Sequence, residues 1–76
     1  MTKTETLGSA IRVALARRGR AVAWMVDELQ GGGLDVGKSR IYGWVIDDPM
    51  YRPPDDDERK HLAAVLGLRI KDLPTT

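Results

Sequence analysis

Apolar residues in this chain recur three or four positions apart, in short segments that end at a glycine or a proline. This spacing puts the apolar side chains on one face of an α-helix. It predicts helices over about residues 4–18, 21–29, 37–46 and 55–66, with a short fifth helix around residues 68–73. No segment alternates apolar and polar residues for long enough to predict a sheet. We therefore expect an all-α fold, a compact bundle of about five short helices that forms a single domain over residues 1–76.

The length of 76 residues and the lack of cysteine limit what the chain can build. A domain of this size has apolar surface for one small core, which argues against an elaborate catalytic cleft. Without cysteine there is no disulfide framework and no thiolate metal site. No apolar run approaches the roughly 20 residues that span a bilayer, and the amino terminus lacks a secretory pattern. We expect a cytoplasmic protein that is not an enzyme and uses no cofactor, metal or membrane.

Residues 37–46 have two unlike faces when they are wound as a helix. Ile41, Trp44 and Val45 form an apolar stripe with the spacing i, i+3 and i+4, so we expect these side chains in the core. The opposite face and the first turn carry polar, basic or small residues, namely Lys38, Ser39, Tyr42 and Gly43. Residues 47–54 follow as a loop, because their three prolines disfavour a helix.

Charge is divided unevenly along the chain. Residues 1–44 hold seven cations and four anions, a net charge of +3, whereas residues 45–76 hold five cations and seven anions, a net charge of −2. A positively charged half suits a polyanionic partner, which the negative half repels. The pattern favours a nucleic acid as the partner and predicts that it contacts the first half of the chain.

Two segments together resemble the lambda-repressor-like, or XRE-type, family of helix-turn-helix DNA-binding domains. The recognition helix of that family reads as a small or polar cap, three polar residues, an aliphatic residue, two variable residues and a tryptophan or leucine. Residues 37–44, Gly-Lys-Ser-Arg-Ile-Tyr-Gly-Trp, fit that order. Residues 61–73 look like the closing segment of the family, with Leu66-Gly67 as the helix stop. The resemblance implies a helix-turn-helix. The turn of this chain, Gln30 to Val36, departs from the family's tight turn of about four residues, because it is longer and contains three consecutive glycines.

The resemblance also implies a function and its residues. It implies sequence-specific binding to an operator in double-stranded DNA, by a transcriptional regulator of the repressor type found in bacteria and bacteriophages, and it leaves a homodimer open. The residues expected to contact base edges in the major groove are Lys38, Ser39, Tyr42 and Gly43. The residues expected to contact phosphates are Arg40, Arg17, Arg18 and Arg20. Arginines at the end of the first helix equally suit its dipole.

Two alternatives use the same residues. Gly32-x-x-x-x-Gly37-Lys38-Ser39 matches the phosphate-binding loop of nucleotide-binding enzymes. That loop needs a strand before it and a parallel sheet behind it, and neither is predicted here, so we expect no nucleotide. The second alternative is a protein-interaction module on the same fold, such as an antitoxin or an anti-activator. DNA binding in a gel-shift assay at moderate salt would separate it from a DNA-binding regulator.

Overall fold

The computed structural model describes residues 6–74, and its helices begin and end where the sequence supplies a cap or a break. Helix α1, Leu7–Arg18, begins after Thr6, whose hydroxyl accepts a hydrogen bond from the backbone N–H of Ser9 at 3.1 Å. It ends at Gly19, which has a φ of 66°. The predicted start of this helix, at about residue 4, lies outside the described residues.

Helix α4, Asp56–Leu66, has the most complete caps. Asp55 accepts a hydrogen bond from the backbone N–H of Glu58, and the Glu58 carboxylate accepts one from the backbone N–H of Asp55. This reciprocal capping box satisfies two backbone donors that the helix leaves free. Gly67 ends the helix with a φ of 72°. The acidic run of residues 55–58 is thus the start of a helix.

Helices α2, Val22–Gly31, and α3, Lys38–Val45, begin after Ala21 and Gly37, neither of which forms a side-chain cap. The connection between them, residues 32–37, is nevertheless tied to the core. Leu34 and Val36 are buried, and the side-chain amide of Gln30 donates to the carbonyl oxygen of Val36 at 3.1 Å. The glycine-rich connection is therefore held by buried apolar residues that follow its glycines.

The prediction of a fifth helix was wrong. After Gly67 the chain makes only a 3₁₀ turn, η1, Ile70–Asp72, so the described residues contain four α-helices and no strand. Too few residues remain between Gly67 and Pro74 for a further α-helix with a series of i to i+4 hydrogen bonds. The segment is held instead by the buried Leu73 and by the Arg59 guanidinium, which donates to the carbonyl oxygens of Ile70, Leu73 and Pro74.

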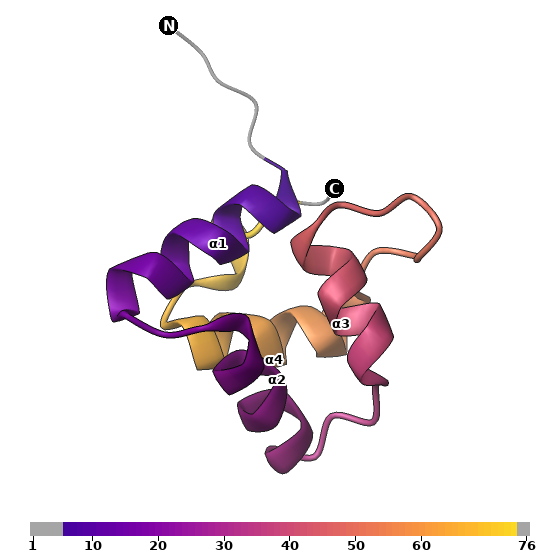
Figure 1. Ribbon diagram of the computed structural model, residues 1–76, viewed down its shortest axis with the longest axis horizontal. Coiled ribbons are helices and arrows are strands. Elements are labelled where there is room, and N and C mark those ends of the chain that lie inside the picture. The colour runs from indigo at the N-terminus through magenta and orange to yellow at the C-terminus, as the bar shows by residue number, and fades with distance from the viewer. Residues whose placement is uncertain (1–5, 75–76) are drawn as a thin grey trace, which may run out of the picture.

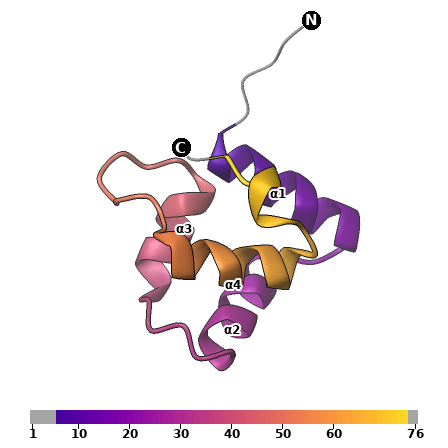
Figure 2. The ribbon, with the colours of Figure 1, turned by 180° about the vertical axis from the view of Figure 1, so that it is seen from behind.

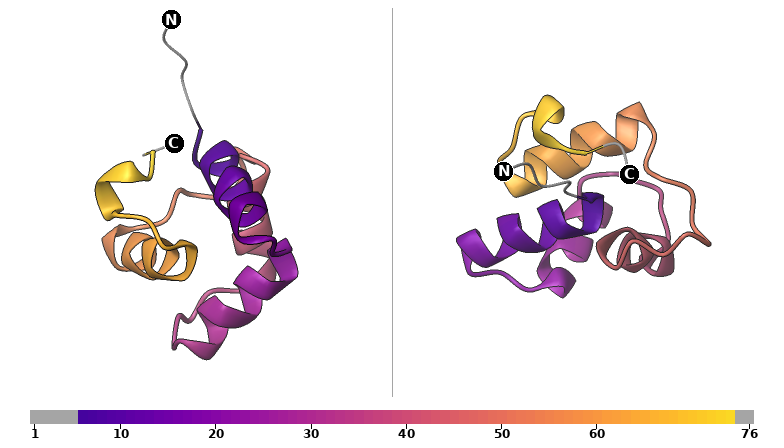
Figure 3. Two further views of the ribbon diagram at one scale, coloured as in Figure 1. Left: turned by 90° about the vertical axis from the view of Figure 1, so that its left-hand side faces the viewer. Right: turned by 90° about the horizontal axis from the view of Figure 1, so that it is seen from above.

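The helices pack around one core. In Figure 1, α1 and α3 meet at the top of the molecule, α2 lies below them and α4 crosses behind. The view from behind in Figure 2 shows α4 in front of α2, and Figure 3 shows η1 folded back on α4. The core residues are Leu7, Ile11, Ala14, Leu15, Met25, Val26, Leu29, Leu34, Val36, Ile41, Trp44, Val45, Leu62, Ala63, Leu66 and Leu73. All four helices of the described residues therefore contribute side chains to one apolar core.

The start of α1 and the end of α3 are joined by polar contacts. The Asp47 carboxylate accepts hydrogen bonds from the backbone N–H of Gly8 at 2.8 Å and from the Thr6 hydroxyl at 2.6 Å. It thereby places a negative charge at the positive end of the α1 dipole. Asp47 takes a left-handed backbone conformation, with a φ of 56°, at this contact. Arg12 donates from its guanidinium to the carbonyl oxygen of Val45. The carboxyl end of α3 is therefore fixed on α1.

A buried carboxylate fixes the loop after α3. The Glu58 carboxylate accepts hydrogen bonds from the Arg52 guanidinium at 2.9 and 3.0 Å, in addition to the one from Asp55. The indole N–H of Trp44 donates to the carbonyl oxygen of Arg52 at 2.9 Å. The loop is thus attached to α4 through a charged pair and to α3 through a buried indole.

We expect this attachment to depend on pH. Burial by itself raises the pKa of Glu58, but the hydrogen bonds from Arg52 and Asp55 and the charge of Arg52 bring that pKa below its usual 4.5. A lowered pKa in the folded state stabilises the fold above pH 4.5, and this stabilisation is lost as the pH falls through the lowered pKa. Thermal melts followed by circular dichroism should show that Glu58→Gln lowers the melting temperature at neutral pH.

The same melts at lower pH provide the control for the charge of Glu58. The difference in melting temperature between wild type and Glu58→Gln should shrink as the pH falls through the lowered pKa of Glu58, because the wild-type carboxylate then becomes neutral as well. A difference that stays the same from neutral pH through the acid range would contradict an ionised Glu58 in the fold.

Candidate nucleic-acid interface

Helix α3 has the two faces that its sequence predicts. Ile41, Trp44 and Val45 are buried in the core, which confirms the expected apolar stripe. Lys38 and Ser39 are exposed, and the Tyr42 side chain is 39% exposed on the opposite face. The structure therefore brings together three of the four residues predicted to contact base edges on one open helix face.

The structure places Gly43, the fourth predicted base-contacting residue, away from this open face. It is buried beneath the ring of Tyr51, and a Cβ atom added at Gly43 would lie 2.9 Å from Cγ of that ring. Its lack of a side chain permits a close contact with Tyr51 in the loop after α3, and this loop covers Gly43. The sequence placed Gly43 on the exposed face because a helical projection takes no account of a residue eight positions later that folds back.

Arg40 lies beside the exposed face of α3 and is half-buried. With Lys38 it gives this helix two cations, and no residue from Lys38 to Val45 carries a negative charge. A helix of about 10–12 Å diameter that is positive and carries hydroxyl donors matches the width and the acceptor groups of the major groove of DNA.

The three arginines predicted at the end of α1 do not form one cluster. The guanidinium carbons of Arg18 and Arg20 lie 5.6 and 5.0 Å from the centroid of the Trp24 ring, within the range of a cation–π contact. Arg17 instead lines a hollow with Leu68 and Asp72, beside η1. The three arginines are close in sequence, but neighbouring residues on a helix point about 100° apart, so the side chains separate.

The arginines and α3 lie at different ends of α1. Figures 1 and 3 show the turn from α1 to α2 at the end of α1 that is remote from α3. The pair on Trp24 is held in place by the indole, and a guanidinium over a ring keeps donors at its edge for an anion. Arg18 and Arg20 therefore form one preorganised basic group around Trp24.

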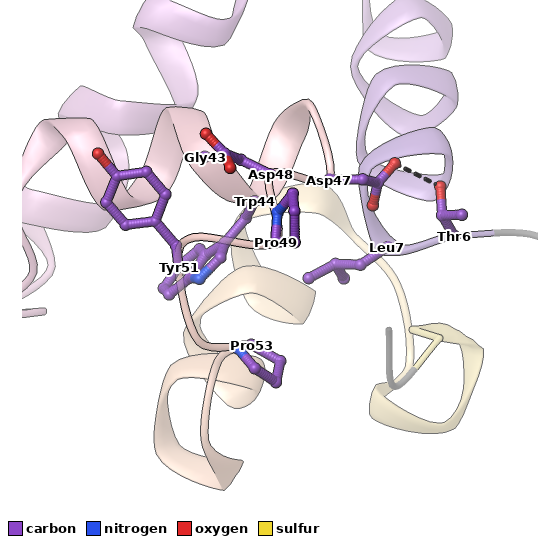
Figure 4. A pocket seen from close by; sticks show the side chains of 9 residues that line it. All are labelled: Thr6, Leu7, Gly43, Trp44, Asp47, Asp48, Pro49, Tyr51 and Pro53. Carbon is purple, nitrogen blue, oxygen red and sulfur yellow. Dashed lines mark hydrogen bonds between the residues drawn. The ribbon is translucent and has the colours of Figure 1, made fainter.

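Two exposed apolar residues follow the polar face of α3 and were missing from the sequence prediction. Ile46 is 65% exposed and Met50 is 83% exposed. An apolar hollow of about 360 Å³ lies between α1, α3 and the loop (Figure 4), lined by Thr6, Leu7, Gly43, Trp44, Asp47, Asp48, Pro49, Tyr51 and Pro53. Ile46 could have been found from spacing, because Ser39, Tyr42 and Ile46 follow one another at i, i+3 and i+7.

The arrangement around Lys38 and Ser39 differs from a phosphate-binding loop. Helix α2 stands where that loop requires a strand, and residues 6–74 contain no strand for a sheet behind it. Within the same residues, no three of the histidine, cysteine, aspartate and glutamate side chains gather as a metal site would need. His61 places its Nδ1 2.9 Å from the carbonyl oxygen of Asp57, one turn earlier on α4.

Comparison with protein-family models, curated proteins and solved structures finds no match to this chain. No helix in the described part of the chain has both the length and the apolar character to cross a bilayer.

Proposed function

We propose that this protein binds double-stranded DNA sequence-specifically and acts as a transcriptional regulator of the repressor type found in bacteria and bacteriophages. The observation that carries the proposal is the exposed surface of α3, where Ser39 and Tyr42 lie away from the buried Ile41, Trp44 and Val45, and Lys38 is exposed in the first turn. In this proposal α2 and α3 are the two helices of a helix-turn-helix, residues 32–37 are its turn, and α3 is the recognition helix.

The proposed base contacts follow from the chemistry of the exposed side chains. Lys38 donates hydrogen bonds to the guanine acceptors O6 and N7, and Ser39 donates or accepts at a neighbouring base edge. Tyr42, one turn further along, presents an aromatic edge and a hydroxyl. Several distinct partners along one helix give a preference for one base sequence over others.

Phosphate contacts orient the protein. Arg40 lies beside the exposed face of α3, where it meets a phosphate at the edge of the groove. Arg18 and Arg20, held on Trp24, meet the backbone to one side, and Arg17 adds a further positive charge near the same end of α1. These contacts contribute affinity and carry little sequence preference.

Repression follows from occupancy of an operator that overlaps a promoter, which requires neither catalysis nor a cofactor. A second copy on a palindromic site would double the contacts, as the two-fold symmetry of many operators suggests. Selection of bound duplexes from a random pool tests both points, because a palindromic product indicates two copies.

Removal of the proposed base contacts should weaken specific binding. We expect Lys38→Ala or Ser39→Ala to reduce affinity for the selected duplex by about 1 to 3 kcal/mol and to relax the preference at one or two base pairs. Competitive gel shifts against single-base variants measure both effects. Lys60→Ala, on α4, removes a second exposed lysine and should leave the preference unchanged. Wild-type preference in both α3 variants would show that α3 is not the recognition helix.

A further inference from the structure

Ile46 is an apolar side chain that the fold presents to solvent in a fixed position. It is 65% exposed although it directly follows the buried Val45. Its backbone N–H donates to the carbonyl oxygen of Tyr42 at 3.2 Å, which continues the hydrogen bonding of α3. The neighbouring residues on both sides are attached to α1, Val45 through Arg12 and Asp47 through Gly8 and Thr6. The exposure of Ile46 is therefore not the result of a frayed helix end.

The position of Ile46 continues the proposed DNA-contacting face. Ser39, Tyr42 and Ile46 are separated by three and four residues and lie along one side of α3, so they form a single exposed stripe. At a rise of about 1.5 Å per residue the stripe is about 10 Å long, which corresponds to about three base pairs at 3.4 Å each. A duplex that contacts Ser39 and Tyr42 along this side therefore extends under Ile46.

The charges at this end of the stripe favour a base over a phosphate. Asp47 and Asp48 follow Ile46 directly, and their carboxylates accept hydrogen bonds from the start of α1 and from the backbone N–H of Met50. Two carboxylates repel phosphates, whereas Lys38 and Arg40 at the other end attract them. An uncharged base edge on the floor of the groove remains as the partner for Ile46.

We propose that Ile46 recognises the 5-methyl group of a thymine in the major groove. That methyl group is the apolar feature that distinguishes a base pair on this side of the duplex, and an aliphatic side chain covers it without a hydrogen bond. Contact with the methyl group removes from water an aliphatic surface that the fold otherwise leaves open. The inference rests on the proposed function, since it assigns one more contact to the same recognition helix.

Replacement of single thymines by deoxyuridine tests the proposal, because the change removes only the methyl group. The full chain is titrated with the selected duplex and with a series in which each thymine is replaced in turn. We expect one position per protein copy at which the wild type loses about four-fold in affinity, the effect of burying one methyl group. It should lie about two to four base pairs from the position that Ser39→Ala relaxes.

The variants connect the effect to the side chain. Ile46→Ala should bind the thymine duplex at least about four-fold more weakly than the wild type and should no longer distinguish thymine from deoxyuridine at that position. Ile46→Val, which keeps a branched side chain, should retain the distinction. Val13→Ala is the matched control, because Val13 is an exposed aliphatic residue on α1, 43% exposed. It should leave the whole deoxyuridine pattern unchanged.

The outcomes separate this inference from the proposed function. Sequence-specific binding in which no thymine shows the effect, or in which Ile46→Ala responds to deoxyuridine as the wild type does, would overturn the role of Ile46 and leave the regulator intact. A random pool that yields no preferred sequence would overturn both. If Ile46→Ala loses both DNA binding and its helical signal, it is unfolded, and Ile46→Val becomes the deciding variant. An Ile46→Val protein that binds the thymine and deoxyuridine duplexes equally well would also overturn the inference.

Discussion

Gly8→Ala should destabilise the fold by about 2 to 4 kcal/mol, although alanine is the better helix former. A Cβ atom at Gly8 would overlap the carbonyl oxygen of Val45 and would lie 2.6 Å from a carboxylate oxygen of Asp47. The end of α3 must then move away from α1, which breaks the charged hydrogen bond from the Gly8 N–H to Asp47. The propensity gain of about 1 kcal/mol is too small to offset these losses.

Thermal and urea melts followed by circular dichroism measure this effect. For a domain of this size, the expected loss lowers the melting temperature by about 10 to 30 °C. Gly31→Ala is the matched control, because Gly31 also lies in a helix and a Cβ atom there meets nothing within 4 Å. It should be neutral or slightly stabilising. A Gly8→Ala protein that melts at or above the wild-type temperature would contradict the close contact between α1 and α3.

DNA affinity should fall steeply with salt. If Arg40 and two or three of the α1-end arginines meet phosphates, and Lys38 lies close to one, one protein copy shows a slope of log affinity against log salt of about −3 to −5, and two copies about twice that. Between 50 and 200 mM salt this amounts to a loss of roughly 60- to 1,000-fold per copy. Fluorescence anisotropy titrations at four or more salt concentrations give the slope.

Variants locate the phosphate contacts. Replacing Arg18 and Arg20 together by glutamine should make the slope shallower by about 2, and Arg17→Gln alone by up to about 1, with the preferred sequence unchanged. Lys60 and Lys71, exposed on α4 and η1, form the control pair and should leave the slope unchanged. Arg59 is unsuitable as a control, because it holds the C-terminal segment. A larger change of slope in the control pair would mean that the DNA-binding surface lies on the other half of the molecule, around α4 and η1.

The sequence by itself determined the features that depend on residues a few positions apart. The stops at Gly19 and Gly67 and the start of α4 at its acidic first turn are local, because each is decided by backbone conformation or by hydrogen bonds within one turn. The burial of Trp44 also followed from spacing, since an apolar stripe on a short helix has only one core to face. The all-helical character was predictable for the same reason.

Only the tertiary structure decided which surfaces remain open. Tyr51 returns to cover Gly43, so a residue predicted to approach DNA is enclosed. Trp24 separates Arg18 and Arg20 from Arg17, and Asp47 fixes α3 on the start of α1 across 39 positions of the chain. These outcomes depend on contacts between segments that are distant in sequence. Periodicity reports only which face of a helix is apolar, whereas the packing of the other segments determines what that helix leaves exposed.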